Sequence, residues 1–278
     1  MSAKKMIFIL FFNIFSFNIW IFSQNTDNEL ITIKKIFDSI VSFQNEQKIL
    51  VFEKQIDSLL KIYLAEPKNF ESDLSILKDY CVTIFSSDKK LKILTWYAYY
   101  PISYSYNYHG YIMYKPRKNK FKFYKLIDKS DEIQNCEFQI LTESNWFGCV
   151  YYEIIEKKRN SQTVYTLLGW DGNSFLSNKK LIEVLDIKED KIFFGDDFDI
   201  EGKKTKRVVF EYSKSAGMLL RWHSTMDMII WDHLSPSLPK YKGIYQYYGP
   251  DFTYDGLEFR NNKWQWKSNI LVLPDKKK

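Results

Sequence analysis

Residues 147–169, FGCVYYEIIEKKRNSQTVYTLLG, decide the fold class of this chain. β-Branched and aromatic residues fill two runs, Phe147 to Glu156 and Thr163 to Gly169, and a short polar segment separates them. Residues of these types favour strands. Because a parallel pair needs a long crossover, two strands joined by so short a link pair antiparallel. The stretch therefore predicts antiparallel β structure.

The same pattern extends from about Tyr80 to the end of the chain. Apolar positions recur with a period of two, and turn-forming residues such as Asp171-Gly172-Asn173 separate the runs. The run from Leu181 to Leu185 fits either a strand or a helix. The other candidate strands are Val82–Phe85, Lys92–Ala98, Gly110–Lys115, Lys120–Ile127, Lys191–Phe194, Arg207–Tyr212, Met218–His223, Met226–Asp232, Tyr245–Tyr248 and Lys263–Lys267.

Residues 24–79 have helical periodicity instead. Apolar residues recur every three or four positions from Leu30 to Leu64. Asn45 is a candidate N-cap between two helices, Pro67 closes the second, and Phe70 to Lys78 is a candidate third helix. The sequence thus predicts a mainly β protein, α+β overall, with a small helical region at 24–79 before a large antiparallel β domain at 80–278.

Two arrangements of the β domain remain open. A meander or a sandwich explains the strand pattern. Tryptophans near strand ends, such as Trp96, Trp146 and Trp170, also suit an irregular, propeller-like fold. We find no repeat of fixed period that would support a propeller. The first arrangement is therefore favoured.

The first 23 residues have the layout of a secretory signal peptide. Lys4 and Lys5 precede an apolar run from Met6 to Phe22, and Ser23 is a small residue at the cleavage position. The alternative is a retained transmembrane anchor, but no basic stop-transfer cluster follows the run. Because the first cysteine is Cys81, lipid attachment is not expected. We therefore expect a periplasmic or secreted product that crosses a membrane without remaining embedded in it.

Composition and charge exclude several classes of protein. Removal of 23 from 278 residues leaves 255, and loss of Lys4 and Lys5 lowers the formal charge from +6 to +4. That charge is too small to indicate a nucleic-acid partner. No glycine-rich phosphate loop is present, so no cofactor is expected. Cys81, Cys136 and Cys149 lack metal-ligand spacing. A Cys136–Cys149 bridge and three buried thiols remain alternatives, with the second slightly favoured.

The acidic segment Gly195 to Gly202 begins like a calcium loop. Asp197, Asp199 and Glu201 occupy alternate positions, and a glycine follows, as in D-x-D-x-D-G. The pattern ends there, because Val208 stands where a bidentate glutamate is required. These three acidic residues are candidate metal ligands, and a solvated hairpin end is the alternative.

Residues 218–233 hold the densest group of candidate catalytic side chains. A histidine beside a carboxylate can perform acid–base catalysis, and His223 with Asp227 or His233 with Asp232 would supply such a pair. Neighbouring residues of a strand point to opposite faces, however, which favours structural roles. No G-x-S-x-G motif is present. No enzyme class is supported, and a role other than catalysis is favoured.

The segment YQYYGPDFTYDGL, Tyr245 to Leu257, is the best candidate ligand-binding site. Aromatic faces around glycine turns can stack on a sugar or a peptide, or can seal the end of a β core. A second tyrosine-rich stretch from Tyr97 to Tyr108, expected to be a loop, would complete a shared groove. The candidate binding residues are Tyr247, Tyr248, Asp251, Tyr254 and Asp255.

Two sets of residues form a distinctive signature. The first is YTLLGWDGN (165–173) with SNKK (177–180); the second runs from FEY (210–212) through DHLSP (232–236) to YYGPDF (247–252) and YDG (254–256). Together they resemble a group of exported, functionally uncharacterised proteins common in Bacteroidota. The resemblance implies export and carries no activity or ligand. We expect an exported, non-catalytic β-rich protein that binds glycan or peptide at the cell envelope, with a secreted carboxylate-dependent hydrolase as the alternative.

Overall fold

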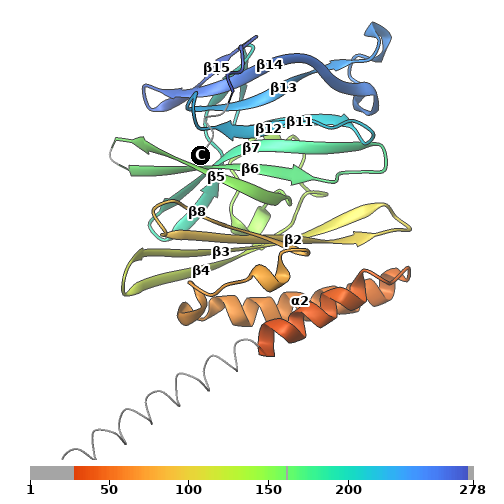
Figure 1. Cartoon of the computed structure of the whole chain (residues 1–278), viewed down its shortest axis with the longest axis vertical. Coiled ribbons are helices and arrows are strands. Elements are labelled where there is room, and N and C mark those ends of the chain that lie inside the picture. Colours follow the sequence, from red (N-terminus) through yellow and green to blue (C-terminus); the bar gives the residue numbers. More distant parts are fainter. Residues whose placement is uncertain (1–27, 161, 275–278) are drawn as a thin grey trace, which may run out of the picture. The chain divides into compact units, whose positions relative to one another are not determined.

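A computed structural model describes residues 28–160 and 162–274 (Figure 1). The chain divides into two compact units between Asp79 and Tyr80, where the periodicity changes from helical to alternating. The expected signal peptide, residues 1–23, lies outside the described residues. Within the described part, no helix has both the length and the apolar character that a membrane crossing requires.

The first unit is helical, as predicted. Residues 28–40 form one helix and α2 (Glu46–Ala65) forms the second. The side chain of Asn45 accepts a hydrogen bond from the backbone N–H of Lys48 at 3.1 Å, which confirms the predicted N-cap. The apolar stripe of α2, including Ile56 and Leu60, is fully buried.

The predicted third helix at residues 70–78 is wrong. The structure has two short 3₁₀ turns here, η1 (Pro67–Asn69) and η2 (Ser75–Leu77). The carboxylate of Asp73 accepts a hydrogen bond from the backbone N–H of Ser75 at 2.8 Å. Such a local bond competes with helical backbone pairing, so the segment forms a tight turn instead.

The second unit contains three antiparallel sheets and a small hairpin. The first sheet has the order β1-β2-β3-β4, the middle sheet β11-β7-β6-β5 with β8 beside β7, and the third sheet β12-β13-β14-β15. The hairpin is formed by β9 and β10. The strands are β1 (Cys81–Phe85), β2 (Leu91–Tyr100), β3 (Ser105–Arg117), β4 (Lys120–Ile127), β5 (Val150–Arg159), β6 (Gln162–Asp171), β7 (Ser177–Lys188), β8 (Lys191–Phe194), β9 (Phe198–Ile200), β10 (Lys203–Thr205), β11 (Val208–Ser213), β12 (Leu220–His223), β13 (Met228–Pro236), β14 (Tyr248–Arg260) and β15 (Lys263–Lys267). Short 3₁₀ turns lie at η3 (Cys136–Phe138), η4 (Glu143–Asn145), η5 (Pro239–Tyr241) and η6 (Tyr245–Tyr247).

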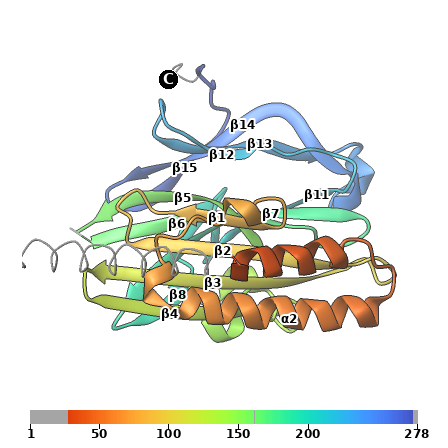
Figure 2. The ribbon, with the colours of Figure 1, turned by 60° about the horizontal axis from the view of Figure 1, so that its bottom comes forward.

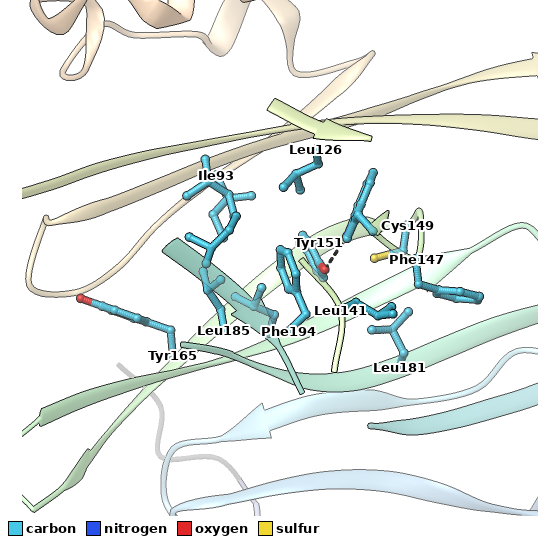
Figure 3. Close-up of a cluster of buried hydrophobic side chains, with 14 of the residues drawn as sticks. Ile93, Leu126, Leu141, Phe147, Cys149, Tyr151, Tyr165, Leu181, Leu185 and Phe194 are labelled. Atoms are coloured by element: carbon cyan, nitrogen blue, oxygen red, sulfur yellow. Dashed lines mark hydrogen bonds between the residues drawn. The ribbon is translucent and has the colours of Figure 1, made fainter. Parts of the chain in front are cut away.

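The three sheets are stacked in layers (Figure 1). One core joins the first and middle sheets, where Ile93 and Leu126 point toward Leu185 and Phe194 (Figure 3). A second core joins the opposite face of the middle sheet to the third sheet. The layers correspond to the predicted sandwich, extended by one more sheet, rather than to propeller blades.

Burial on both faces of the middle sheet explains why the sequence from Leu181 to Leu185 fits either a strand or a helix. In β7 the neighbouring residues Leu181 and Ile182 point into different cores, and both are fully buried. A strand buried on both faces reads as a continuous apolar run without alternation. The run from Leu181 to Leu185 therefore has no sequence pattern that separates a strand from a helix.

A charged network lies inside the first core. Arg207 Nε donates to Glu183 Oε2 at 2.9 Å, and both side chains are fully buried. Tyr151 also donates to Glu183, and Trp146 Nε1 donates to the Tyr151 hydroxyl at 2.8 Å. Arg207 further donates to the carbonyl of Phe194 at 3.2 Å, so it ties β8 to the core.

Two of the three cysteines match the favoured alternative of buried thiols. Cys81 and Cys149 are buried thiols and Cys136 is half-buried; none of the three is in a disulfide. Burial raises the pKa of the Cys81 and Cys149 thiols, which keeps both of them protonated.

Candidate functional site

The predicted aromatic segment at 245–257 is mostly a strand. It begins with the 3₁₀ turn η6 and continues as β14, which pairs with β13. The register is irregular: Asp232 pairs with Tyr254 and Leu234 with Pro250, so β14 spans four positions where β13 spans two. This is a bulge, which re-aims side chains next to it. The segment contains Gly249, Pro250 and Gly256, which are typical of turns, so its sequence does not indicate that most of it is a strand.

The bulge brings His233 beside two carboxylates. His233 Nδ1 lies 2.8 Å from Asp255 Oδ2, and His233 Nε2 lies 3.9 Å from Asp251 Oδ2. Asp255 is only 4% exposed, and its other oxygen accepts the backbone N–H of Asn269 at 3.0 Å. The turn between β9 and β10 adds Glu201: one ligand atom each from Glu201, His233 and Asp255 lie within 4.8 Å of one another. We call Glu201, His233, Asp251 and Asp255 the carboxylate–histidine group.

Electrostatics follow from this geometry. The hydrogen bond from His233 to Asp255 raises the pKa of the imidazole, against the opposing effect of burial, and the charges of Asp255, Asp251 and Glu201 raise it further. Burial opposes ionisation of Asp251, but two hydrogen bonds from Thr253 and the charge of His233 lower its pKa. The imidazolium form of His233 is thus favoured by its surroundings.

We expect Asp255→Asn to lower the pKa of His233. The wild-type imidazole should titrate above its usual value of about 6.5, and the variant closer to it, because the main raising interaction is lost. The raised pKa means that the charged pair stabilises the fold below about pH 6.5 and that this contribution is lost as the pH rises through the folded-state pKa. Ring NMR resonances measure the titration, with Asp199→Asn as the control. An unchanged His233 pKa in Asp255→Asn would contradict the assignment.

A groove lies next to this group. It has a volume of about 570 Å³ and is lined by Phe252, Thr253, Tyr254 and residues 269–274. The backbone N–H of Ile270 donates to the carbonyl of Tyr254 at 2.8 Å, which holds the C-terminal segment against β14. The side chain of Phe252, at the bulge, is 90% exposed.

His223 has a structural role. Its side chain is fully buried. Its Nε2 lies 2.7 Å from the carbonyl oxygen of Leu273, and its Nδ1 accepts the backbone N–H of Met226 at 3.3 Å. Both ring nitrogens thus bond to backbone groups, and His223 fastens the C-terminal segment to the third sheet.

The aspartates near the two histidines in sequence have other partners. Asp227 forms an ion pair with Lys157 at 2.6 Å, and Asp232 accepts a backbone N–H at 2.6 Å. The partner of His233 is Asp255, from the neighbouring strand and 22 residues away. Sequence adjacency could not indicate this pair, because it depends on the register and on the bulge.

The acidic residues of segment 195–202 do not converge on one site. Asp197 forms an ion pair with Lys206 at 2.6 Å, which lowers the pKa of its carboxyl. Asp199 is exposed on β9. Glu201, in the turn after β9, reaches His233 and Asp255. Of the three candidate metal ligands, the structure brings only Glu201 into the converging group.

Aromatic residues gather at another place, the ends of β2 and β3. The expected loop from Tyr97 to Tyr108 is wrong: the two strands continue to Tyr100 and from Ser105, and Tyr97 pairs with Tyr108. The rings of Tyr97 and Tyr106 lie 5.4 Å apart, and those of Tyr99 and Tyr106 lie 5.0 Å apart. The strands thus present a ladder of tyrosines.

The middle sheet extends this ladder. Trp170 lies 5.7 Å from the ring of Tyr97, and Phe175, in the β6–β7 turn, lies 4.6 Å from the ring of Tyr104. The hydroxyl of Tyr108 donates to Asp171 at 2.8 Å and accepts the backbone N–H of Gly172. These two bonds anchor the β6–β7 turn on β3.

The third sheet contributes rings at the same end. Tyr247 stacks on Tyr241 at 4.1 Å, and the ring of Tyr245 lies 5.1 Å from that of Tyr248. The corresponding segments lie together at the right of Figure 1 and again in Figure 2. We call this surface the aromatic end; its exposed rings are Tyr97, Tyr99, Tyr104, Phe175, Tyr245 and Tyr247.

The predicted ligand-binding residues therefore divide between the aromatic end, the carboxylate–histidine group and the groove beside that group. Tyr247 and Tyr248 belong to the aromatic end, Asp251 and Asp255 belong to the carboxylate–histidine group, and Tyr254 lines the groove. Comparisons with protein family models, curated proteins and solved structures found no match to this chain.

Proposed function

We propose that this protein is exported to the periplasm or secreted, and that it binds a glycan at the cell envelope without acting on it. The signal-peptide layout of residues 1–23 and the signature in the β domain support export. The aromatic end supports ligand binding. These two features are independent of each other, because one concerns the leader and the other the folded domain.

The aromatic end is the observation that carries the binding proposal. The six exposed rings lie on segments from three sheets, and these segments reach the same side of the domain in Figure 1. Within them, Tyr97 and Tyr99 contact the Tyr106 ring, and Tyr104 contacts Phe175. Clusters of solvent-exposed aromatic groups are a marker of interaction surfaces. They sit on strands and short turns rather than on long loops, so little conformational entropy is lost when a ligand orders them.

The chemistry of these rings favours a glycan. Most are tyrosines, which have an apolar face and a polar edge. A sugar ring has the same division, with C–H groups on its faces and hydroxyls on its rim. Lys214 holds the Tyr106 ring in place, since its Nζ lies 5.1 Å from that ring and donates to the Tyr106 hydroxyl at 3.1 Å, to the carbonyl of Gly172 at 2.9 Å and to Asn178 Oδ1 at 2.9 Å. Stacking and hydrogen bonding can thus act on one sugar at once.

A glycan array followed by calorimetry tests this proposal. We expect the double variant Tyr97→Ala and Tyr99→Ala to bind about 10- to 100-fold more weakly than the wild type, because central aromatic contacts dominate such interfaces. The control is Phe252→Ala, which removes an exposed ring outside the aromatic end and should leave the affinity unchanged. Thermal unfolding of each variant checks that the fold is intact.

Three outcomes would overturn the proposal. The first is an array without any bound glycan, and the second is equal affinity in the double variant and the wild type. The third is cleavage of the bound glycan, which would favour a secreted carboxylate-dependent hydrolase. The contact between His233 and Asp255 favours this second candidate, because an imidazolium oriented by a carboxylate is suited to general-acid catalysis.

A further inference from the structure

We propose that Glu201, His233 and Asp255 bind a divalent transition-metal cation, with zinc as the best match. The three ligand atoms come from three separate segments, the β9–β10 turn, β13 and β14, and lie within 4.8 Å of one another. This site is distinct from the aromatic end, and the proposal does not depend on glycan binding.

Small shifts would bring the three ligand atoms to the distances of a metal site. Zinc bonds of about 2.0–2.2 Å to nitrogen and oxygen place tetrahedral ligands about 3.3–3.6 Å apart. His233 Nδ1 and Asp255 Oδ2 are 2.8 Å apart, at hydrogen-bond distance, so a cation would replace the proton between them and the two atoms would separate by about 0.5 Å or more. Glu201 is exposed in a turn, and its carboxylate would have to approach the other two ligand atoms from within 4.8 Å to about 3.5 Å.

The donor set indicates the class of metal. One imidazole and two carboxylates suit zinc and related transition metals. Calcium and magnesium prefer oxygen ligands alone, so the histidine argues against them. Three protein ligands would leave a position for water or for an outside ligand, as in zinc sites that are not purely structural.

The charge of these residues and of Asp251 also favours a cation. Glu201, Asp251 and Asp255 are three acidic residues around one histidine. Among the described residues, the ion pairs of Asp251 and Asp255 are with His233, and no lysine or arginine pairs with any of the three carboxylates. A divalent cation would neutralise this excess. Asp255 is also held rigidly for this role, since it is buried and bonded to the backbone of Asn269.

Titration of the purified full-length protein with cobalt(II) and zinc(II) tests the site. We expect one equivalent to bind, with visible cobalt absorption of a low-coordinate N/O site that zinc displaces. His233→Ala and Glu201→Gln should each weaken binding by about tenfold or more, because each removes a ligand. Glu201 is in an exposed turn, so its variant should fold normally. Asp199→Asn is the matched control: it removes a carboxylate of the same hairpin that lies outside the group, and its affinity should equal that of the wild type.

Two results would overturn the inference. One is the absence of a saturable, stoichiometric cobalt or zinc complex. The other is an affinity of Glu201→Gln equal to that of Asp199→Asn, which would mean that Glu201 is not a ligand and that the three residues do not form one site.

Discussion

Replacement of Glu183 by alanine is expected to lower the free energy of unfolding by about 3–5 kcal/mol. Glu183 and Arg207 are fully buried and bonded at 2.9 Å. Removal of the carboxylate leaves the guanidinium of Arg207 charged in an apolar core, because burial cannot neutralise a group with so high a pKa. Tyr151 also loses the acceptor for its buried hydroxyl. Urea unfolding under reducing conditions measures the change.

Two further variants test whether the loss of stability in Glu183→Ala comes from the burial of the charged pair. Glu183→Gln keeps the shape and one acceptor but removes the charge, so it should be less destabilising than Glu183→Ala. Lys203→Ala removes the exposed ion pair between Lys203 and Glu137 and should cost less than about 1 kcal/mol. If Glu183→Ala were as mild as Lys203→Ala, the network would not be holding the first core together.

Much of the fold was predictable because period-two alternation follows directly from one-sided burial. Most strands of the first and third sheets were recognised, although β2 is buried at its first six positions and β13 at its first four, where β-branched and aromatic content indicated the strand instead. The middle sheet packs on both faces, so Leu181 to Leu185 lost the alternation. β14 was missed for another reason: Gly249, Pro250 and Gly256 are typical of turns, and only pairing with β13 shows that the strand accommodates them.

The candidate site was predictable in its residue types but not in its arrangement. Glu201, Asp255 and His233 were each singled out, yet for three different roles. What joins them is the register of β13 with β14, the bulge between them and the placement of the β9–β10 turn. These are tertiary features, and no local sequence pattern encodes a distance between positions so far apart in the chain.

Gly256→Ala is expected to destabilise the protein by about 1–3 kcal/mol and to loosen the carboxylate–histidine group. A Cβ at Gly256 would lie 2.8 Å from the carbonyl oxygen of Ile229, closer than side chains tolerate. The obstacle is backbone of the paired strand, so β13 and β14 must move apart. Asp255 is the adjacent residue in β14, and its 2.8 Å contact with His233 crosses between the same two strands.

Gly249→Ala supplies a control on the same strand. A Cβ there would meet only the side chain of Ala216 at 3.6 Å, an ordinary contact, so stability should change by less than about 0.5 kcal/mol. Unfolding curves compare the two variants, and the NMR titration of His233 reports on the site. In Gly256→Ala the pKa of His233 should fall toward its usual value, since a longer contact with Asp255 raises it less. If Gly256→Ala lost stability with an unchanged His233 titration, the position of Asp255 would not depend on close packing of β13 and β14. The carboxylate–histidine group would then be held by Asn269 and the C-terminal segment instead.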